Sequence, residues 1–266
     1  MGDGVILSRE EIIALESSLA RRVEVHETLA STQERAKELA LGDPGTPHGT
    51  LVVSKVQTGG RGRLGRSWGS PAGGLWMSLV LRLDLLLHLA PRITPAAAVG
   101  VAKALQKMGV NTRIKWPNDL LVDGAGGRKI CGILAEAGGQ ASNNFIVLGV
   151  GINANVDPQN LEDPPRKTAS LRSELGRDVD LLELLETVLA KLDSEIGRLH
   201  DFGVILEDWK ELDCTLGERV LVRRFGEVVE GTAINLGPEG ALVIRTNGGI
   251  VEVYEGDVEH LYQGGT

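Results

Sequence analysis

Three arginines separated by glycines are the residues of this chain best suited to chemistry. They lie in the run Gly60–Trp68, which reads GRGRLGRSW and is called the arginine loop below. Glycine lets the backbone approach a ligand closely, and the arginine fork suits phosphate and carboxylate oxygens. The surrounding stretch Pro44–Leu83 contains no Asp or Glu, although the chain has a formal net charge of -8. We therefore expect the arginine loop to hold an anion.

The arginine loop also matches the dinucleotide fingerprint GxGxxG, but its context argues against that fold. The fingerprint requires a helix that begins at the glycines, so that the helix N-terminus meets a pyrophosphate. Here the sequence continues SWGSPAGG, which cannot form such a helix. A Walker A loop is excluded as well, because no Gly-Lys-Ser/Thr closes the motif. The plainer alternative is a solvated loop whose arginines bind nothing.

Two more segments could act on the same anion. Lys115–Asp119 (KWPND) places a lysine at a strand end, and its Asn118 and Asp119 could share Mg²⁺ or a nucleotide edge, or merely form a turn. Lys129 begins an apolar strand, where its ammonium could bridge a carboxylate and a phosphate, although most lysines lie on the surface. Gly132 in that strand would let a ligand lie flat against it.

Short strands and a few helices must position these residues. Ser31 is expected to cap a helix that ends at Gly42, and Thr94 and Pro95 to begin another that ends before Gly109. A strong amphipathic helix is predicted over Asp180–Leu199. The predicted strands up to this point are Thr50–Val56, Leu75–Leu83, Arg113–Trp116, Leu120–Asp123, Lys129–Ala137 and Asn144–Val150.

The character of the chain changes from Leu216 onward. Four short strands separated by glycine turns are predicted there: Glu218–Arg224, Val228–Asn235, Ala241–Thr246 and Ile250–Tyr254. This pattern is typical of a small SH3-like β-barrel, so a domain boundary is expected near Asp213.

Composition narrows the function classes. The sequence pI of about 5.3 argues against broad nucleic-acid binding, which needs a basic surface. Only two cysteines occur, so a disulfide framework is not expected and a reducing cytoplasm is the simplest compartment. No apolar run is long enough to span a bilayer, and no signal peptide is recognisable.

Four segments, in this order and spacing, closely resemble biotin–protein ligases (biotin–[acetyl-CoA-carboxylase] ligases): Gln57–Trp68, Lys115–Asp119, Arg128–Leu134 and Gly149–Asn153. The resemblance runs from about Val23 to about Leu261. It implies an α+β fold, in which residues 1–213 form a mixed-sheet catalytic domain like those of class II aminoacyl-tRNA synthetases. Residues 214–266 would then form the SH3-like C-terminal domain.

The resemblance also implies a two-step reaction. Biotin and MgATP would give biotinyl-5′-AMP and pyrophosphate, and the biotinyl group would then move to a lysine of a biotin carboxyl carrier protein or domain of acetyl-CoA carboxylase. Members that repress transcription carry an extra N-terminal helix-turn-helix domain. Only about two dozen residues precede the first matching strand here, so a DNA partner is not expected, nor is a membrane. A cytoplasmic location is expected, and a homodimer is left open.

Site residues follow from the resemblance position by position. It implies that Lys129, Arg61 and Arg63 are catalytic and that Asp119 is the Mg²⁺ ligand. Biotin would contact Ser31, Thr32, Gln33, Gln57, Arg61, Gly62, Arg63, Lys129 and Gly132, and ATP or the adenylate would contact Arg63, Trp68, Lys115, Asn118 and Asn153. Three positions depart from the family pattern: Gln33 replaces Asn, Gly59 replaces Ala, and Glu255-Gly256-Asp257 replaces Gly-Glu.

Two alternatives are kept. A lipoate or octanoate transferase of the same superfamily would carry a different arginine–glycine signature with a histidine, which this sequence lacks. A nucleic-acid-binding module that uses the arginine loop and the barrel is disfavoured by the acidic composition.

Overall fold

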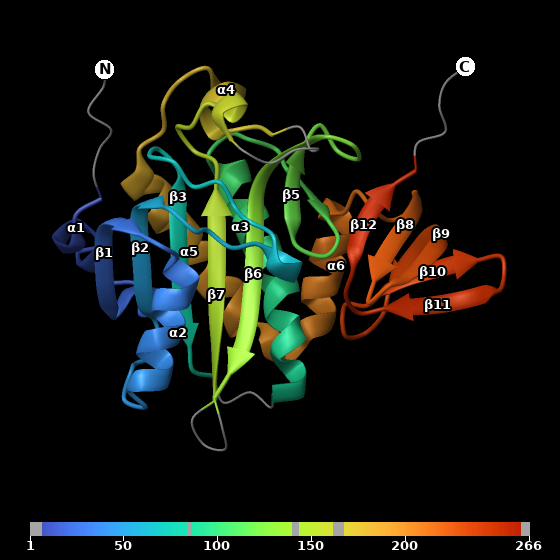
Figure 1. Ribbon diagram of the computed structural model, residues 1–266, viewed down its shortest axis with the longest axis horizontal. Helices are drawn as coiled ribbons and strands as arrows, with labels where there is room; N and C mark the ends of the chain where they lie inside the picture. The colour runs from blue at the N-terminus through green and yellow to red at the C-terminus, as the bar shows by residue number, and fades with distance from the viewer. Residues whose placement is uncertain (1–6, 84–86, 140–143, 162–167, 262–266) are drawn as a thin grey trace.

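Two β-sheets of different size lie side by side in the structure (Figure 1). The computed structural model describes residues 7–83, 87–139, 144–161 and 168–261. The larger sheet has seven strands in the order β1-β2-β3-β7-β6-β5-β4. Its strands are β1 (Arg22–Leu29), β2 (Thr50–Gln57), β3 (Leu75–Leu81), β4 (Arg113–Lys115), β5 (Asp119–Val122), β6 (Arg128–Gly138) and β7 (Phe145–Ile152). Only β1 and β2 pair in parallel, so the sheet is mixed, as predicted.

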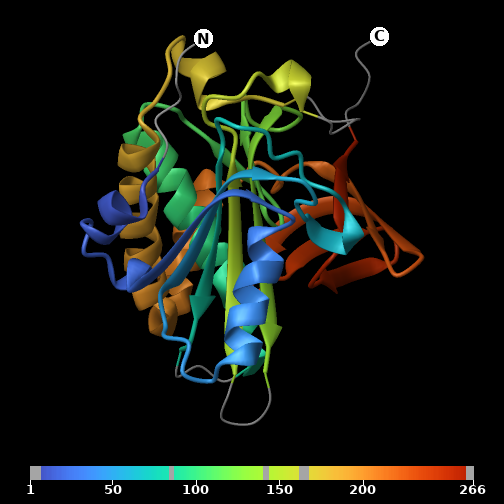
Figure 2. The same ribbon diagram turned by 60° about the vertical axis from the view of Figure 1, so that its left-hand side comes forward.

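Helices cover the two faces of the large sheet unequally. Figures 1 and 2 show α2 (Thr32–Gly42) on one face and the bundle of α3 (Ile93–Lys107), α5 (Leu181–Gly197) and α6 (Phe202–Leu212) on the other. Two short helices, α1 (Arg9–Ile13) and α4 (Leu171–Leu175), lie at the periphery. The α2 face is therefore only partly covered.

Alternation along the strands explains this division, because successive side chains point to opposite faces. Strand residues on the α2 face, Val52, Val80 and Val147, form a small core with Ala36, Leu39, Ala40 and Phe145. Residues of the opposite face join the main core beneath α3 and α5. Farther along the α2 face, the same alternation brings Ser78, Gly149 and Gly151 in place of valines. The apolar cover ends where these small residues begin.

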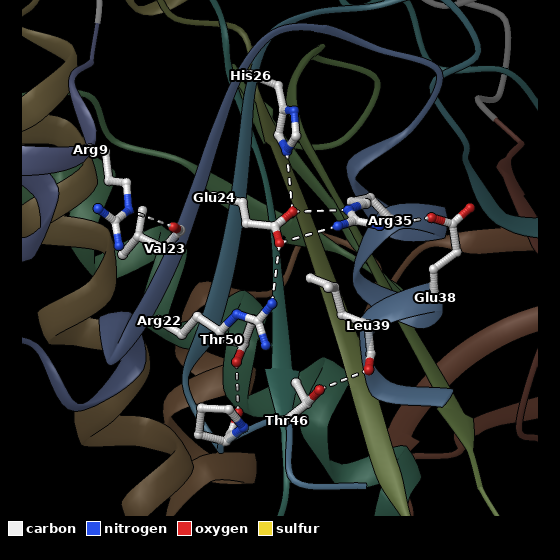
Figure 3. Close-up of polar contacts among 11 residues, drawn as sticks. Arg9, Arg22, Val23, Glu24, His26, Arg35, Glu38, Leu39, Thr46 and Thr50 are labelled. Atoms are coloured by element: carbon white, nitrogen blue, oxygen red, sulfur yellow. Dashed lines mark hydrogen bonds and ion pairs between the residues drawn. The ribbon is translucent and has the colours of Figure 1, made fainter. Parts of the chain in front are cut away.

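An ion-pair cluster fixes α2 to the edge strand β1 (Figure 3). The Arg35 guanidinium of α2 donates to both carboxylate oxygens of Glu24, at 2.9 and 3.2 Å. Arg22 and His26 contact the same carboxylate from β1. Ser31 caps α2 as predicted, because its hydroxyl accepts the N–H of Glu34 at 3.5 Å. These contacts fix where the first turn of α2 lies.

The small sheet is antiparallel and has five strands in the order β11-β10-β9-β8-β12. They are β8 (Arg219–Arg224), β9 (Glu227–Leu236), β10 (Leu242–Thr246), β11 (Gly249–Val253) and β12 (Asp257–His260). This architecture is that of the predicted SH3-like unit: the four predicted strands are confirmed as β8 to β11, but a fifth strand, β12, was missed. The missed strand β12 is only four residues long and is formed by pairing with β8, a long-range contact. The exact division at residues 213 and 214 remains a prediction.

Other departures from the predicted elements are local. Helix α3 begins at Ile93, before Thr94, and the residue preceding it, Arg92, makes no capping side-chain bond. Instead, Arg92 donates to both carboxylate oxygens of Glu239 in the turn between β9 and β10. Helix α6 was not predicted, and strand β1 was implied only by the resemblance, as the first matching strand. Within the described residues, no helix is long and apolar enough to cross a membrane.

We predict that Asp180→Ala lowers the free energy of unfolding by about 1 kcal/mol, because Asp180 caps α5. Its carboxylate accepts the N–H groups of Leu182 at 2.7 Å and Glu183 at 3.2 Å. Urea unfolding measures the change. Asp178→Ala is the matched control, since Asp178 is exposed and pairs only loosely with Arg172, at 3.6 Å. Equal losses in the two variants would contradict the capping role.

Candidate active site

A cavity of about 1010 Å³ opens on the large sheet beyond the first turn of α2. It is lined by the first turn of α2, the arginine loop, the β4–β5 turn, the first half of β6, the end of β7, and β12. The cavity therefore lies where the face of the sheet is no longer covered by apolar side chains. Segments that are far apart in the sequence meet there.

Three glycines form a flat floor. Gly132 of β6 pairs with Gly151 of β7, and Gly149 lies two residues away on the same face. The Trp68 indole lies directly on this floor: a Cβ at Gly132 or Gly151 would stand 3.0 Å or 2.6 Å from the ring. The ring Nε1 is buried and, among the described residues, has no hydrogen-bond partner. The planar Trp68 ring can thus lie against the sheet only because Gly132 and Gly151 have no side chain.

A chain of hydrogen bonds forms the polar end of the cavity. The Gln57 Oε1 accepts from the backbone N–H of Thr32 at 2.8 Å and from its hydroxyl at 3.1 Å. The Thr32 hydroxyl also contacts the Ser78 hydroxyl at 2.9 Å, and Ser78 donates to Gln33 Oε1 at 3.1 Å. Gln57 donates its amide to Ser70 at 2.7 Å. These groups are fixed in place and suit a small polar ligand.

Positive charge converges on the cavity from two directions. Lys129 Nζ lies 2.8 Å from Asp119 Oδ1 and 4.7 Å from the centroid of the Trp68 ring, and both members of the ion pair are nearly buried. Arg61 contacts Glu34 at 3.0 Å but remains more than half exposed. Lys115 is buried at the cavity wall. An anion in the cavity could interact with Lys129, Arg61 and Lys115.

Arg63 is a partly buried cation of the cavity that hydrogen-bonds to neutral groups. Its guanidinium donates to Asn118 Oδ1 at 3.3 Å and to the backbone oxygen of Gly256 at 3.4 Å, both of which are neutral acceptors. Burial lowers the pKa of Arg63, and the carboxylates of Asp119, Glu255 and Asp257 oppose that shift from a distance. Arginine remains charged in proteins, so this arrangement favours an anionic ligand.

The arginine loop is folded back on itself and tied to the small sheet. Gly62 N–H donates to Arg66 O at 2.8 Å, and Trp68 N–H donates to Gly60 O at 2.9 Å. Its short 3₁₀ turn, Arg63–Gly65, leads into no α-helix, which agrees with the rejection of the dinucleotide fingerprint. Arg66 forms two hydrogen bonds with the Asp257 carboxylate, at 3.1 and 2.5 Å. The loop therefore spans the two sheets.

All but one of the sequence-predicted site residues line this cavity. They are Ser31, Thr32, Gln33, Gln57, Arg61, Gly62, Arg63, Trp68, Lys115, Asn118, Asp119, Lys129 and Gly132. Asn153 lies elsewhere: its amide donates to Ala169 O at 2.9 Å and to Lys129 O at 3.5 Å, so it ties β6 to the segment before α4. Asn118 is also used structurally, because its amide donates to Ile133 O at 2.7 Å.

Several lining residues escaped the sequence analysis. Ser78 is the single polar residue in the apolar strand β3, and that isolation was a usable signal. Gly149 and Gly151 fell within a segment of the resemblance but were not assigned to the site, although their two-residue spacing places them on one face. Gly256 and Asp257 were noted only as a departure from the family pattern, because their role depends on contacts with Arg63 and Arg66, which are almost two hundred residues away.

The chain is similar to known families in both of its parts. Residues 25–153 match the Biotin/lipoate A/B protein ligase family, and residues 215–261 match the biotin protein ligase C-terminal domain.

Individual relatives extend the similarity over most of the chain. The bifunctional ligase/repressor BirA of Bacillus subtilis is 36% identical over 240 residues, which cover 88% of this chain and 72% of BirA. A biotin–[acetyl-CoA-carboxylase] ligase of Paracoccus denitrificans is 31% identical, covering 81% of this chain and 90% of its own. The solved biotin protein ligase of Aquifex aeolicus, in complex with biotin and ATP, superposes with a TM-score of 0.74 at 28% identity. It covers 91% of this chain and 99% of the Aquifex chain.

We predict that Gly151→Ala displaces the Trp68 indole from the floor, because the new Cβ would stand 2.6 Å from its Nε1. The fluorescence emission of Trp68, obtained by subtracting the spectrum of the corresponding Trp68→Phe variant, should shift to longer wavelength as the ring becomes exposed. Gly197→Ala is the control, since a Cβ there has nothing within 4 Å. Unchanged Trp68 emission in Gly151→Ala would show that the ring does not lie on this floor.

Proposed function

The chain belongs to the biotin protein ligase family, and we propose that the cavity over the glycine floor is where it works. The protein is an ATP-dependent biotin ligase: it activates biotin with ATP and transfers the biotinyl group to a protein. The observation that carries the assignment to this cavity is the meeting of Lys129, Arg61 and Arg63 around a flat, partly polar pocket. Biotin and ATP are both anionic, so bringing them together requires a cavity with several positive charges.

In the first step a carboxylate oxygen of biotin attacks the α-phosphorus of ATP. The new O–P bond forms as the bond to pyrophosphate breaks, and negative charge must be stabilised while two anions approach each other. We assign this to Lys129, which would exchange its contact with Asp119 for the biotin carboxylate and the α-phosphate. Arg61 and Arg63 would supply further charge from the arginine loop. This chemistry requires no acid–base pair.

The remaining groups divide between the two substrates. Thr32, Gln33 and Gln57 would hold the ureido end of biotin, because their hydrogen-bonding groups lie at the polar end of the cavity. Trp68 would leave the glycine floor and pack against the adenine ring, while Lys115 and Asn118 would line the nucleotide side. For Asn153 we propose an indirect role, since it holds the start of β6, which carries Lys129.

In the second step the neutral amine nitrogen of a carrier lysine attacks the carbonyl carbon of the mixed anhydride, AMP leaves as the C–O bond breaks, and the nitrogen loses a proton as it becomes an amide. The anhydride is prone to hydrolysis, so the cavity must stay closed until the carrier arrives. We propose that the arginine loop closes it. The acceptor is proposed to be a biotin carboxyl carrier protein or domain of acetyl-CoA carboxylase, in the cytoplasm.

Mg²⁺ is proposed to arrive bound to ATP as part of the substrate. The carboxylate first assigned to it, Asp119, is paired with Lys129, and the described residues contain no group of three His, Cys, Asp or Glu side chains that could hold a metal. This donor set fits a metal held mainly by phosphate oxygens. The lack of a DNA partner also remains a prediction, and a homodimer is still left open.

We predict that Lys129→Ala slows biotin-dependent ATP–pyrophosphate exchange by about 100-fold or more, because it removes a charge needed in the transition state. Circular dichroism should show an intact fold. Lys55→Ala is the control, because Lys55 pairs with Glu27 away from the cavity. Near-normal exchange in Lys129→Ala would refute the catalytic assignment.

We predict that Arg63→Gly releases biotinyl-5′-AMP faster than the unsubstituted protein, because it removes the two bonds that connect the arginine loop to Asn118 and Gly256. The release rate can be followed with radiolabelled adenylate after gel filtration. Arg177→Gly, in an exposed turn, serves as the control. If the release rates were equal, closure by the arginine loop would have to be abandoned.

A further inference from the structure

Gln33 stands where the family pattern has Asn, and every hydrogen of its side-chain amide is used within the protein. Its Nε2 donates to Glu136 Oε2 at 2.9 Å and to the backbone oxygen of Val147 at 3.1 Å. The Gln33 side chain is nearly fully buried beneath the first turn of α2. Its amide nitrogen therefore faces the protein and is saturated.

The amide oxygen of Gln33 lies on the cavity side. It accepts one hydrogen bond, from the Ser78 hydroxyl at 3.1 Å, and an amide oxygen can accept two. A Cβ at Gly149 would stand 2.5 Å from this oxygen, so the oxygen rests on the glycine floor. Gln33, Ser78 and Gly149 all line the cavity. The remaining acceptor position is thus available to a ligand that donates N–H.

Glu136 keeps the amide in this orientation. Burial raises the pKa of the Glu136 carboxyl, but hydrogen bonds from Lys37 and Gln33 outweigh it, so the net shift is downward. The Lys37 Nζ lies 2.8 Å from Glu136 Oε1. An ionised carboxylate can only accept hydrogen bonds. A flipped Gln33 amide would turn its oxygen toward two acceptors, Glu136 and Val147 O, which is unfavourable.

We propose that Glu136 is a positioning residue for substrate choice: by holding the Gln33 amide it presents an acceptor to the ureido N–H of biotin. The proposal rests on the proposed function of the cavity. Glu136 is not among the residues that line the cavity, so it acts through Gln33. Glutamine is one methylene longer than the asparagine of the family pattern. Its Nε2 bonds to Glu136 and to the backbone oxygen of Val147, while its Oε1 lies on the glycine floor.

A second carboxylate provides a matched control. Glu24 of β1 anchors the same helix, α2, through Arg35 (Figure 3). Among the described residues its side chain contacts Arg22, His26 and Arg35, none of which lines the cavity. The Glu24 side chain is 19% exposed, compared with 32% for Glu136. After loss of Glu136, Lys37 still has Glu34 at 3.6 Å. A general loosening of α2 would therefore affect both variants alike.

The test compares Glu136→Met, Glu136→Gln and Glu24→Met in biotin-dependent ATP–pyrophosphate exchange. Glu136→Met should raise KM for biotin by about tenfold, because one hydrogen bond to the ligand is lost, while kcat and KM for ATP stay within about twofold. Glu136→Gln retains an acceptor and should restore KM to within about threefold. Glu24→Met should leave KM for biotin within about twofold.

A double-mutant cycle tests whether Glu136 acts through Gln33. Asn at position 33 is one methylene shorter and should not reach Glu136, so Glu136→Met should change KM by less than about twofold in a Gln33→Asn background. An unchanged KM in Glu136→Met, an equal rise in Glu24→Met, or an undiminished effect in the Gln33→Asn background would each overturn the proposal. If Glu136→Met does not fold, a fall in kcat without a rise in KM in Glu136→Gln would overturn it. No exchange in the unsubstituted protein would instead overturn the proposed function, and this inference with it.

Discussion

The site exists because α2 covers only part of one face of the large sheet. Over Val52, Val80 and Val147 the helix buries a small apolar core. Beyond its first turn the same face carries Ser78, Gly149 and Gly151, so little apolar surface is left for a second helix to cover. The cost of leaving a sheet face uncovered is low when its side chains are hydrogen atoms. A flat cavity floor follows from that choice of residues.

The position of α2 consequently controls the polar end of the cavity. Arg35 and Glu24 fix the helix to β1 on one side, and Lys37 and Glu136 fix it to β6 on another. Both pairs are partly buried and have good hydrogen-bond geometry, so they contribute more to orientation than exposed pairs do. Because Thr32 and Gln33 lie in the first turn of α2, these ion pairs also determine their positions in the cavity. The other end of the cavity is organised by charge, through Lys129 and the arginine loop.

The sequence predicted the features that depend on neighbouring residues but not the contacts between residues far apart in the chain. The Ser31 cap, the absence of a helix after the arginine loop and the Lys129 strand were all predicted from neighbouring residues, and the structure confirms each of them. The resemblance supplied thirteen of the residues that line the cavity. Strand β12 and the role of Asp257 were missed, since they depend on partners far away in the sequence. The Gln33–Glu136 contact was missed for the same reason, because no spacing rule joins residues 103 positions apart.

The arginine loop has anchors in both sheets, and this has a mechanical consequence. Arg63 reaches Asn118 in the large sheet and Gly256 in the small one, while Arg66 grips Asp257 at the start of β12. A movement of the small sheet would therefore alter the contacts of the arginine loop, which lines the cavity. A protein that shifted the small sheet on arrival would also move the arginine loop, without itself entering the cavity.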